Sequence, residues 1–389
     1  IWRIACAQLW NHCLKACLHV IDLGETNHKF KTLGSLVTQL SSWVFGEVKE
    51  DALEISIRQT EYCGVDSYPV IEIDNRKVFS EIENERWSDE RSAFDSECVF
   101  GQLYRAMKGV RKDVLRCKLD GKDRLIAVKM KGEQGLDWGG LYRETMERCV
   151  EDLFSSHIDL FIRSPNSTRS TSEDRFIPNP RYHDNHDANS IYRFVGNLIG
   201  VSLRTRQQLG FELSSFIWKA IVSDEPREED LSMIDSEFVN MLHEVEDADV
   251  SLQECFSSVF ELVMSITDSA GNEVELVAGG EGIPVTWENH LEFVALARDM
   301  RMNEGAPAAT AIAEGVWEVV PKKVLKLFTW EQLERSVKGE PEISVDVLRR
   351  HTVYLGWTEH HPVVERFWNV MSQLTDKDRS QFLRFAWGR

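Results

Sequence analysis

The chain has 389 residues, of which 42% are hydrophobic and 28% charged, and its formal net charge is −19 at pH 7. This composition is typical of a folded, soluble protein rather than a disordered one, and the length predicts two or three domains. The acidic balance argues against a general nucleic-acid or membrane-surface binder and favours a protein that meets basic patches on other proteins. No apolar run reaches the roughly 18 residues that a membrane span needs.

Eight cysteines are scattered along the chain, and no Cys-x-x-Cys pair occurs among them. Nothing at the N-terminus has the layout of a secretory signal, so we expect reduced thiols in the cytosol or the nucleus. The chain begins with Ile1 rather than Met and stops at Arg389 inside an apolar, aromatic stretch. We therefore expect a piece of a longer polypeptide.

The first part of the chain predicts helices around one extended segment. Apolar residues at helical spacing predict helices over 1–20 and 29–45, and alternation over 69–79 predicts a strand. A third helix is predicted by the apolar series Val99, Leu103, Met107, Val110 and Val114. Ten Lys or Arg fall between Arg105 and Lys131; a solvated helix face is the favoured interpretation, with a partner-binding patch as the alternative.

The first predicted helix also carries a candidate metal cluster, namely His12, Cys13, Cys17 and His19. The four residues are close enough in sequence to bind zinc. Because Cys13 and Cys17 lie near the apolar stripe of Ile4 and Leu9, we favour buried structural thiols. A second pair with a metal-like spacing, His183 and His186, has no partners nearby in the sequence, so no metal is expected there either.

The stretch "GEQGLDWGGLYRE" at 132–144 joins a β-rich run to a predicted helix. It lacks the third glycine of a dinucleotide fingerprint, and Leu141 and Tyr142 stand where a P-loop needs Lys and Ser or Thr. A metal or acid–base site is a minor alternative, since no second acidic cluster supports it. We expect an architectural turn instead, in which Gly139 and Gly140 accept no side chain. Its residues are Gly132, Gly135, Asp137, Gly139, Gly140 and Arg143.

The rest of the chain alternates between polar loops and predicted helices. Gly196 and Gly200 lie one turn apart in an apolar helix, which suits close packing against another element. A hairpin is predicted to turn near Gly271. Polar loops are expected at 163–175 and 223–230, and helices at 287–300, 308–319 and 331–337.

Six motifs in order resemble one family, the HECT ubiquitin ligases. They are "GEQGLDWGGLYRE", "FIPNP" at Phe176–Pro180, "YRFVGNLIGVSL" at Tyr192–Leu203, "GGEGIPVTWENHLEFV" at Gly279–Val294, "FTWEQLERSVKG" at Phe328–Gly339, and "ISVDVLRRHTVYLGW" with the stretch that follows it. The resemblance covers about Ser96–Arg389, and the terminal "RFAWGR" is most similar to the HERC-type subgroup. Residues 1–95 carry no recognised motif.

The resemblance implies an α+β, mainly helical fold in two lobes. The N-terminal lobe would span 96–353, with a small subdomain at about 236–305 that binds a ubiquitin-conjugating enzyme. A hinge at 354–357, with Tyr354 and Gly356, would lead into the start of the C-terminal lobe at 358–389. The docking residues implied by the motifs are Ile266, Val274, Leu276 and Ile312, with filling of the subdomain core as the alternative for each.

The implied activity is that of a ubiquitin-protein transferase. A cysteine would accept ubiquitin from the conjugating enzyme as a thioester and pass it to a lysine of a protein substrate. The family's nucleophile lies in a Thr-Cys-Phe context that none of the eight cysteines shares; Cys255 precedes Phe256 but lies in the docking subdomain. We expect the catalytic cysteine beyond Arg389, and no metal or cofactor. The alternatives are a non-catalytic module that recruits the conjugating enzyme or ubiquitin, and an unrelated metal hydrolase.

Overall fold

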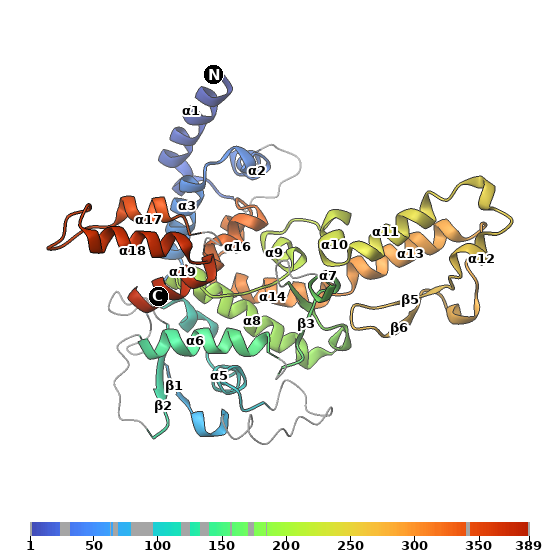
Figure 1. The fold of residues 1–389 in the computed structure, drawn as a ribbon, viewed down its shortest axis with the longest axis horizontal. Helices are drawn as coiled ribbons and strands as arrows, with labels where there is room; N and C mark the ends of the chain where they lie inside the picture. Colours follow the sequence, from blue (N-terminus) through green and yellow to red (C-terminus); the bar gives the residue numbers. More distant parts are fainter. Residues whose placement is uncertain are drawn as a thin grey trace.

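The computed structural model describes residues 2–23, 32–62, 64, 69–78, 96–117, 125–132, 140–155, 158–169, 175–183, 185–339 and 343–387. In these ranges the chain is mainly helical, with three two-stranded sheets (Figure 1). This architecture confirms the predicted mainly-α, α+β class. The buried hydrophobic residues form three clusters. The members of the second cluster lie, in the sequence, between two groups of members of the first. Among the described residues, no helix is both long and apolar enough to cross a membrane.

The N-terminal region contributes three helices and two short 3-10 turns. They are α1 (Trp2–Cys17), η1 (Leu18–Val20), α2 (Leu33–Gln39), η2 (Ser41–Trp43) and α3 (Gly46–Gln59). The predicted helix over 1–20 is confirmed, whereas the described part of 29–45 is helical only in α2 and η2. The buried Asn11 side chain fixes α1 to the next elements, since it donates to the Trp43 carbonyl at 2.8 Å and accepts from the Phe45 amide at 2.6 Å.

The predicted apolar stripe on α1 is wrong. Only Asn11 and Leu14 of α1 are buried, whereas Ile4, Leu9 and Cys13 are exposed. In Figure 1 the first turns of α1 project away from the body. The helix therefore touches the core only near its C-terminal half, and Cys13 is not a buried structural thiol.

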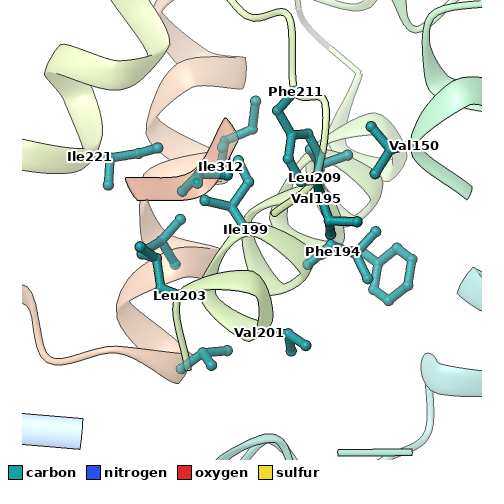
Figure 2. Close-up of a cluster of buried hydrophobic side chains, with 14 of the residues drawn as sticks. Val150, Phe194, Val195, Ile199, Val201, Leu203, Leu209, Phe211, Ile221 and Ile312 are labelled. Carbon is teal, nitrogen blue, oxygen red and sulfur yellow. The ribbon is translucent and has the colours of Figure 1, made fainter. Parts of the chain in front are cut away.

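The main core is built around α8 (His186–Thr205), which is buried along most of its length. It crosses α14 (Ala306–Val319) closely enough that a Cβ at Gly196 would collide with the Ile312 carbonyl, and one at Gly315 with the Arg193 carbonyl. A Cβ at Gly200 would meet Val319. The predicted close packing at Gly196 and Gly200 is thus confirmed. Figure 2 shows the apolar side chains that fill this region.

The other elements of the main core surround this helix pair. They are α5 (Val99–Met107), η3 (Lys112–Arg116), α6 (Gly140–Leu153), α7 (Pro165–Arg169), η4 (Pro180–Tyr182), α9 (Ser215–Val222), α10 (Glu228–Ile234), α15 (Lys322–Leu325) and α16 (Trp330–Lys338). Helix α10 begins inside the stretch predicted to be an acidic loop, because Asp230 is buried and pairs with the buried Lys219 at 2.6 Å. Likewise, α7 forms inside the predicted polar loop at 163–175.

Two of the small sheets border this core. Strand β1 (Val70–Ile73) pairs in parallel with β2 (Ala127–Met130), so the strand predicted over 69–79 is shorter than expected. The chain leaves β1 at Asp74, whose backbone amide bonds to the Gln102 side chain rather than to a strand. Strand β3 (Phe161–Arg163) runs antiparallel to β4 (Phe176–Pro178).

A second core lies within residues 238–300. It comprises α11 (Ser236–Glu246), η5 (Val250–Leu252), α12 (Phe256–Phe260), β5 (Ser265–Thr267), β6 (Glu273–Glu275), η6 (Gly280–Gly282) and α13 (His290–Asn303). Figure 1 shows α11 and α13 side by side, leading away from the main body, with the antiparallel β5–β6 hairpin next to them. The hairpin predicted to turn near Gly271 is confirmed.

The third cluster belongs to α17 (Val345–His351), α18 (Pro362–Gln373) and α19 (Asp376–Trp387). Its buried members are Val364, Trp368 and Met371, and Val345, Leu348 and Tyr354 pack against them. The small size of this cluster distinguishes it from the other two.

Candidate functional site

The stretch 132–144 lies where the sequence predicted a join between a strand and a helix. Strand β2 ends at Met130, Gly132 follows with a φ of +87° that favours glycine, and α6 begins at Gly140. Gly135, Asp137 and Gly139 lie outside the described residues. No described atom lies within 4 Å of a Cβ built at Gly140, which gives no support to the expectation that Gly140 excludes a side chain. Arg143 lies in the first turn of α6, and its carbonyl accepts from Gln207 at 3.4 Å.

No metal centre is found in the described part of the chain, where no group of three His, Cys, Asp or Glu residues could hold an ion. This includes the pairs at His12–His19 and His183–His186. His183 instead contacts the Glu304 carbonyl at 2.8 Å through Nδ1.

Three of the four predicted docking residues lie together on the β5–β6 hairpin. Ile266 on β5 is paired with Val274 on β6, and Leu276 follows β6. Ile266 is 9% exposed and belongs to the second core, against which Leu276 packs; Val274 is half-buried. A charge at Ile266 would therefore disturb the core, which favours the alternative that this side chain fills the subdomain core.

Ile312 does not lie near the other three. It is fully buried in the main core, where Figure 2 shows it among the side chains of α8 and α9. The Gly196 backbone packs directly on its carbonyl. A partner protein cannot reach this side chain in the folded chain, so its assignment to a docking face is wrong.

Other apolar side chains of the small subdomain are exposed, and the sequence motifs did not single them out. They are Val250 in η5, Val259 in α12, Ile283 after η6 and Leu291 at the start of α13. Helix α12 lies at the end of the subdomain remote from the main core (Figure 1), and the ring of Phe256 at its start contacts that of His290 at the start of α13. One signal was available in the sequence, since Leu291 falls outside the spacing of the α13 residues that face the core, His290, Phe293, Val294 and Ala297.

Buried polar contacts hold the small subdomain on the main body. Asn166 of α7 donates to the Ser232 and Met233 carbonyls and accepts from the Ser236 amide at 2.9 Å. The buried Arg301 guanidinium binds the Asp235 carboxylate at 3.1 Å and the Ser269 hydroxyl at 3.0 Å. These bonds fix the start of α11 and the end of α13. The two helices that carry the exposed end of the small subdomain are therefore held rigidly at their other ends.

The thiols differ in their access to solvent. Cys98, Cys117 and Cys149 are buried, and burial together with the nearby Asp152 raises the pKa of Cys149 well above its ordinary value. Cys255 is exposed next to the first residue of α12. A raised pKa suppresses the thiolate, so Cys149 is unsuited to nucleophilic chemistry.

The connection between the main core and the C-terminal helices begins at Gly339. This residue ends α16 with a φ of +88° and a ψ of 179°, and residues 340–342 lie outside the described ranges. The predicted hinge residue Tyr354, by contrast, packs in the third cluster, where its hydroxyl accepts from Trp368 Nε1 at 2.8 Å. Gly356 has a φ of +77° in the exposed loop between α17 and α18. The packing thus joins α17 to α18 across the predicted hinge.

Comparison with known proteins supports the resemblance. The family model described as HECT-domain (ubiquitin-transferase) matches residues 147–389. The chain is 30% identical over 296 residues to the E3 ubiquitin-protein ligases HERC2 of Mus musculus and Homo sapiens, which covers 76% of the chain and 6% of each relative. It is 31% identical over 268 residues to the E3 ubiquitin-protein ligase HACE1 of Danio rerio, which covers 68% of the chain and 28% of that relative.

The chain thus spans only a small part of these relatives. Its match nevertheless extends over most of its own length, through the second core and the C-terminal helices. The chain belongs to the HECT-domain (ubiquitin-transferase) family.

Proposed function

We propose that this chain is the docking and first catalytic-lobe portion of a HECT-type ubiquitin-protein ligase. The ligase accepts ubiquitin from a conjugating enzyme as a cysteine thioester and transfers it to lysines of protein substrates. The family assignment and the identity to two E3 ubiquitin-protein ligases support this proposal.

The observation that carries the proposal is the exposed apolar end of the small subdomain. Val259, Ile283 and Leu291 are large apolar residues held in solvent on a braced support. A transient protein interface needs such an apolar centre within a polar rim. We place the conjugating enzyme on this end, beside the hairpin that carries Val274.

The pivot that the mechanism requires lies, on this proposal, at Gly339, where α16 ends, rather than at Tyr354 and Gly356. A single cysteine has to meet a docked conjugating enzyme first and a substrate lysine afterwards, so its lobe must move. The boundary between two cores is the natural place for that motion, and Tyr354 lies inside the third cluster. The glycine-only backbone at Gly339 supports this position.

The nucleophile, on the same proposal, lies in a Thr-Cys-Phe context that residues 1–389 do not contain. The alternative is a non-catalytic module that recruits a conjugating enzyme or ubiquitin. A longer chain that forms a reducible ubiquitin adduct would exclude this alternative.

Docking is tested by measuring the affinity of a conjugating enzyme for Leu291→Asp and Val347→Asp. Leu291 and Val347 are both exposed, and each lies in the first turn of its helix. An acidic side chain is compatible with the helix dipole at this position. We expect Leu291→Asp to weaken binding about tenfold or more, by placing a charge in an apolar interface. Val347→Asp, on α17, should bind as the unaltered chain does. Equal affinities for both variants would refute the docking face.

A further inference from the structure

A cavity of about 640 Å³ lies where α3, η3, the end of α8 and α16 meet. Basic side chains from three of these elements line it, namely Arg58 of α3, Arg116 of η3 and Arg204 of α8, together with Gln208 and Ser336. The cavity is far from the exposed end of the small subdomain, and the ligase mechanism proposed above makes no use of it.

Arg204 brings a half-buried positive charge into this cavity. Its guanidinium donates to the Thr60 hydroxyl at 3.1 Å and to the carbonyls of Val319, Ile57 and Arg116 at 2.9, 3.0 and 3.1 Å. All four acceptors are neutral oxygens. Burial, and then the nearby Arg116, lower the pKa of Arg204 to about 10. These bonds hold the side chain in place without neutralising it.

Arg116 adds a second positive charge beside the first. Within the described ranges, its side chain has no hydrogen-bond or ion-pair partner, and its Nε atom is buried. A guanidinium that is partly shielded from water, as that of Arg116 is, normally pairs with a carboxylate or another anion, because an unpaired charge is unfavourable there. Two adjacent guanidiniums without a carboxylate contact are the arrangement expected of an anion site.

The other charged groups that line the cavity are arranged differently. Arg58 and Arg206 share Glu54, so each of these exposed cations already has a carboxylate contact. Glu50 accepts a hydrogen bond from the Ser336 hydroxyl at 3.0 Å. Glu61 acts on Arg204 only through its charge. The unpaired positive charge is therefore confined to Arg116 and Arg204, with carboxylates around it.

We propose that this cavity binds the phosphate monoester of a small polyol, such as a sugar phosphate. A phosphate dianion presents several oxygens and can neutralise both guanidiniums at once, which a single carboxylate cannot do. The carboxylates of Glu50 and Glu61, with Gln208 and Ser336, offer acceptors and donors for hydroxyl groups, and they disfavour a larger polyanion. The volume falls in the usual range for small-molecule pockets, roughly 300–1,000 Å³.

The test is a calorimetric titration of residues 1–389 with glucose 6-phosphate, inorganic phosphate and glucose. We expect the phosphate ester to bind more tightly than inorganic phosphate, and glucose not to bind measurably. Binding should weaken as salt is raised, because it neutralises charge. Equal affinities for the ester and for inorganic phosphate would overturn the polyol part of the proposal, and no binding of either would overturn the site.

The matched variants are Arg116→Gln and Arg349→Gln. Arg349 is a surface residue of α17 that pairs with Glu359 at 3.1 Å and does not line the cavity, so its replacement removes the same charge from outside the site. Arg116→Gln should lower the affinity for the ester about tenfold or more, while Arg349→Gln should leave it unchanged. Without ligand, the melting temperature of Arg116→Gln should equal or exceed that of the unaltered chain, since an unpaired charge is removed. A lower melting temperature together with unchanged affinity would mean that Arg116 has only a structural role.

Discussion

Lys49 has a position at odds with its charge. Its side chain in α3 is only 1% exposed and donates to the Gln332 side-chain oxygen of α16 at 2.7 Å. Among the described residues no carboxylate pairs with it, and desolvation lowers the pKa of Lys49 to about 8. The protonated amine is thus stabilised by one neutral oxygen in a site that opposes its charge.

Replacing Lys49 with methionine should raise stability at neutral pH. The folded-state pKa lies below the unfolded value, so the unfolded chain binds more protons between about pH 8 and 10.5, and stability rises with pH over that window. Lys49→Met should increase the free energy of unfolding by about 1–3 kcal/mol at pH 7, and this advantage should shrink above pH 8. Urea unfolding at several pH values measures it; an advantage that does not vary up to pH 10.5 would show that the pKa of Lys49 is not lowered in the folded chain.

Alanine substitutions at two glycines should have different effects on the free energy of unfolding. A Cβ at Gly196 would collide with the Ile312 backbone, which cannot move aside without separating α8 from α14, so Gly196→Ala should cost about 2–4 kcal/mol. Gly140 begins α6 with open space around it, so Gly140→Ala should be neutral or slightly stabilising. Chemical unfolding of the two variants gives both values. A similar loss at both positions would contradict the packing described for α8.

The sequence predicts single residues well only where one physical requirement dominates. Gly196 and Gly200 were identified because two glycines one turn apart in an apolar helix have few uses other than close packing. Ile312 and Cys13 were misplaced because an apolar residue type does not say whether it faces a core or a partner. Lys49 carried no signal, since a lysine in a helix is ordinarily solvated.

At the scale of elements, the last turn of α16 is a fixed end of the main core. The Leu209 amide bonds to the Val337 carbonyl at 2.9 Å, and Lys338 pairs with Glu212 and Glu334. Arg175 also pairs with Glu334. The last turn of α16 is therefore held by several bonds up to Gly339, where the backbone changes to a conformation that glycine tolerates.

Gly339→Ala tests whether this backbone is required. The φ and ψ of Gly339 lie in a region that is essentially restricted to glycine, and a Cβ there would meet the Gln208 amide at 2.7 Å. We expect a loss of about 1–3 kcal/mol in the unfolding of the main core. Gly356→Ala has no such neighbour and should affect only the C-terminal helices. A loss confined to the C-terminal helices in both variants would move the boundary away from Gly339.

Element prediction succeeded where periodicity and turn residues agreed. The hairpin around Gly271 and the apolar helix at 192–203 were found because an alternating or helical pattern met a clear end signal. Helix α3 was not anticipated because its buried set of Val48, Lys49, Ala52 and Leu53 includes a charged residue. The acidic run at the start of α10 predicts a loop. The pattern gives no sign that Asp230 is buried and pairs with Lys219.

For the whole molecule, three separate cores imply unequal stability. Among the described side chains of the C-terminal helices, three are buried in their cluster, and Val363 and Val370 of α18 face solvent. Few buried contacts mean frequent local opening. In hydrogen exchange, amides of α18 should exchange well before those of α8, under conditions where the main core stays folded. Simultaneous exchange of both helices would indicate that the molecule unfolds as one unit.

The order of the motifs predicts the family and the range of the small subdomain. It does not predict which surfaces of the three cores are exposed. The exposed end of that subdomain and the position of the proposed pivot depend on which side chains pack together, and no local pattern encodes this.

The most direct test of the proposed function is a ubiquitin-transfer assay resolved on a non-reducing gel. A conjugating enzyme charged with ubiquitin is mixed with residues 1–389, or with a longer chain that continues through the family's Thr-Cys-Phe motif. We predict that the longer chain forms a ubiquitin adduct that a thiol reductant removes, and that residues 1–389 form none although they bind the enzyme. A reducible adduct on residues 1–389, or none on the longer chain, would contradict the proposal.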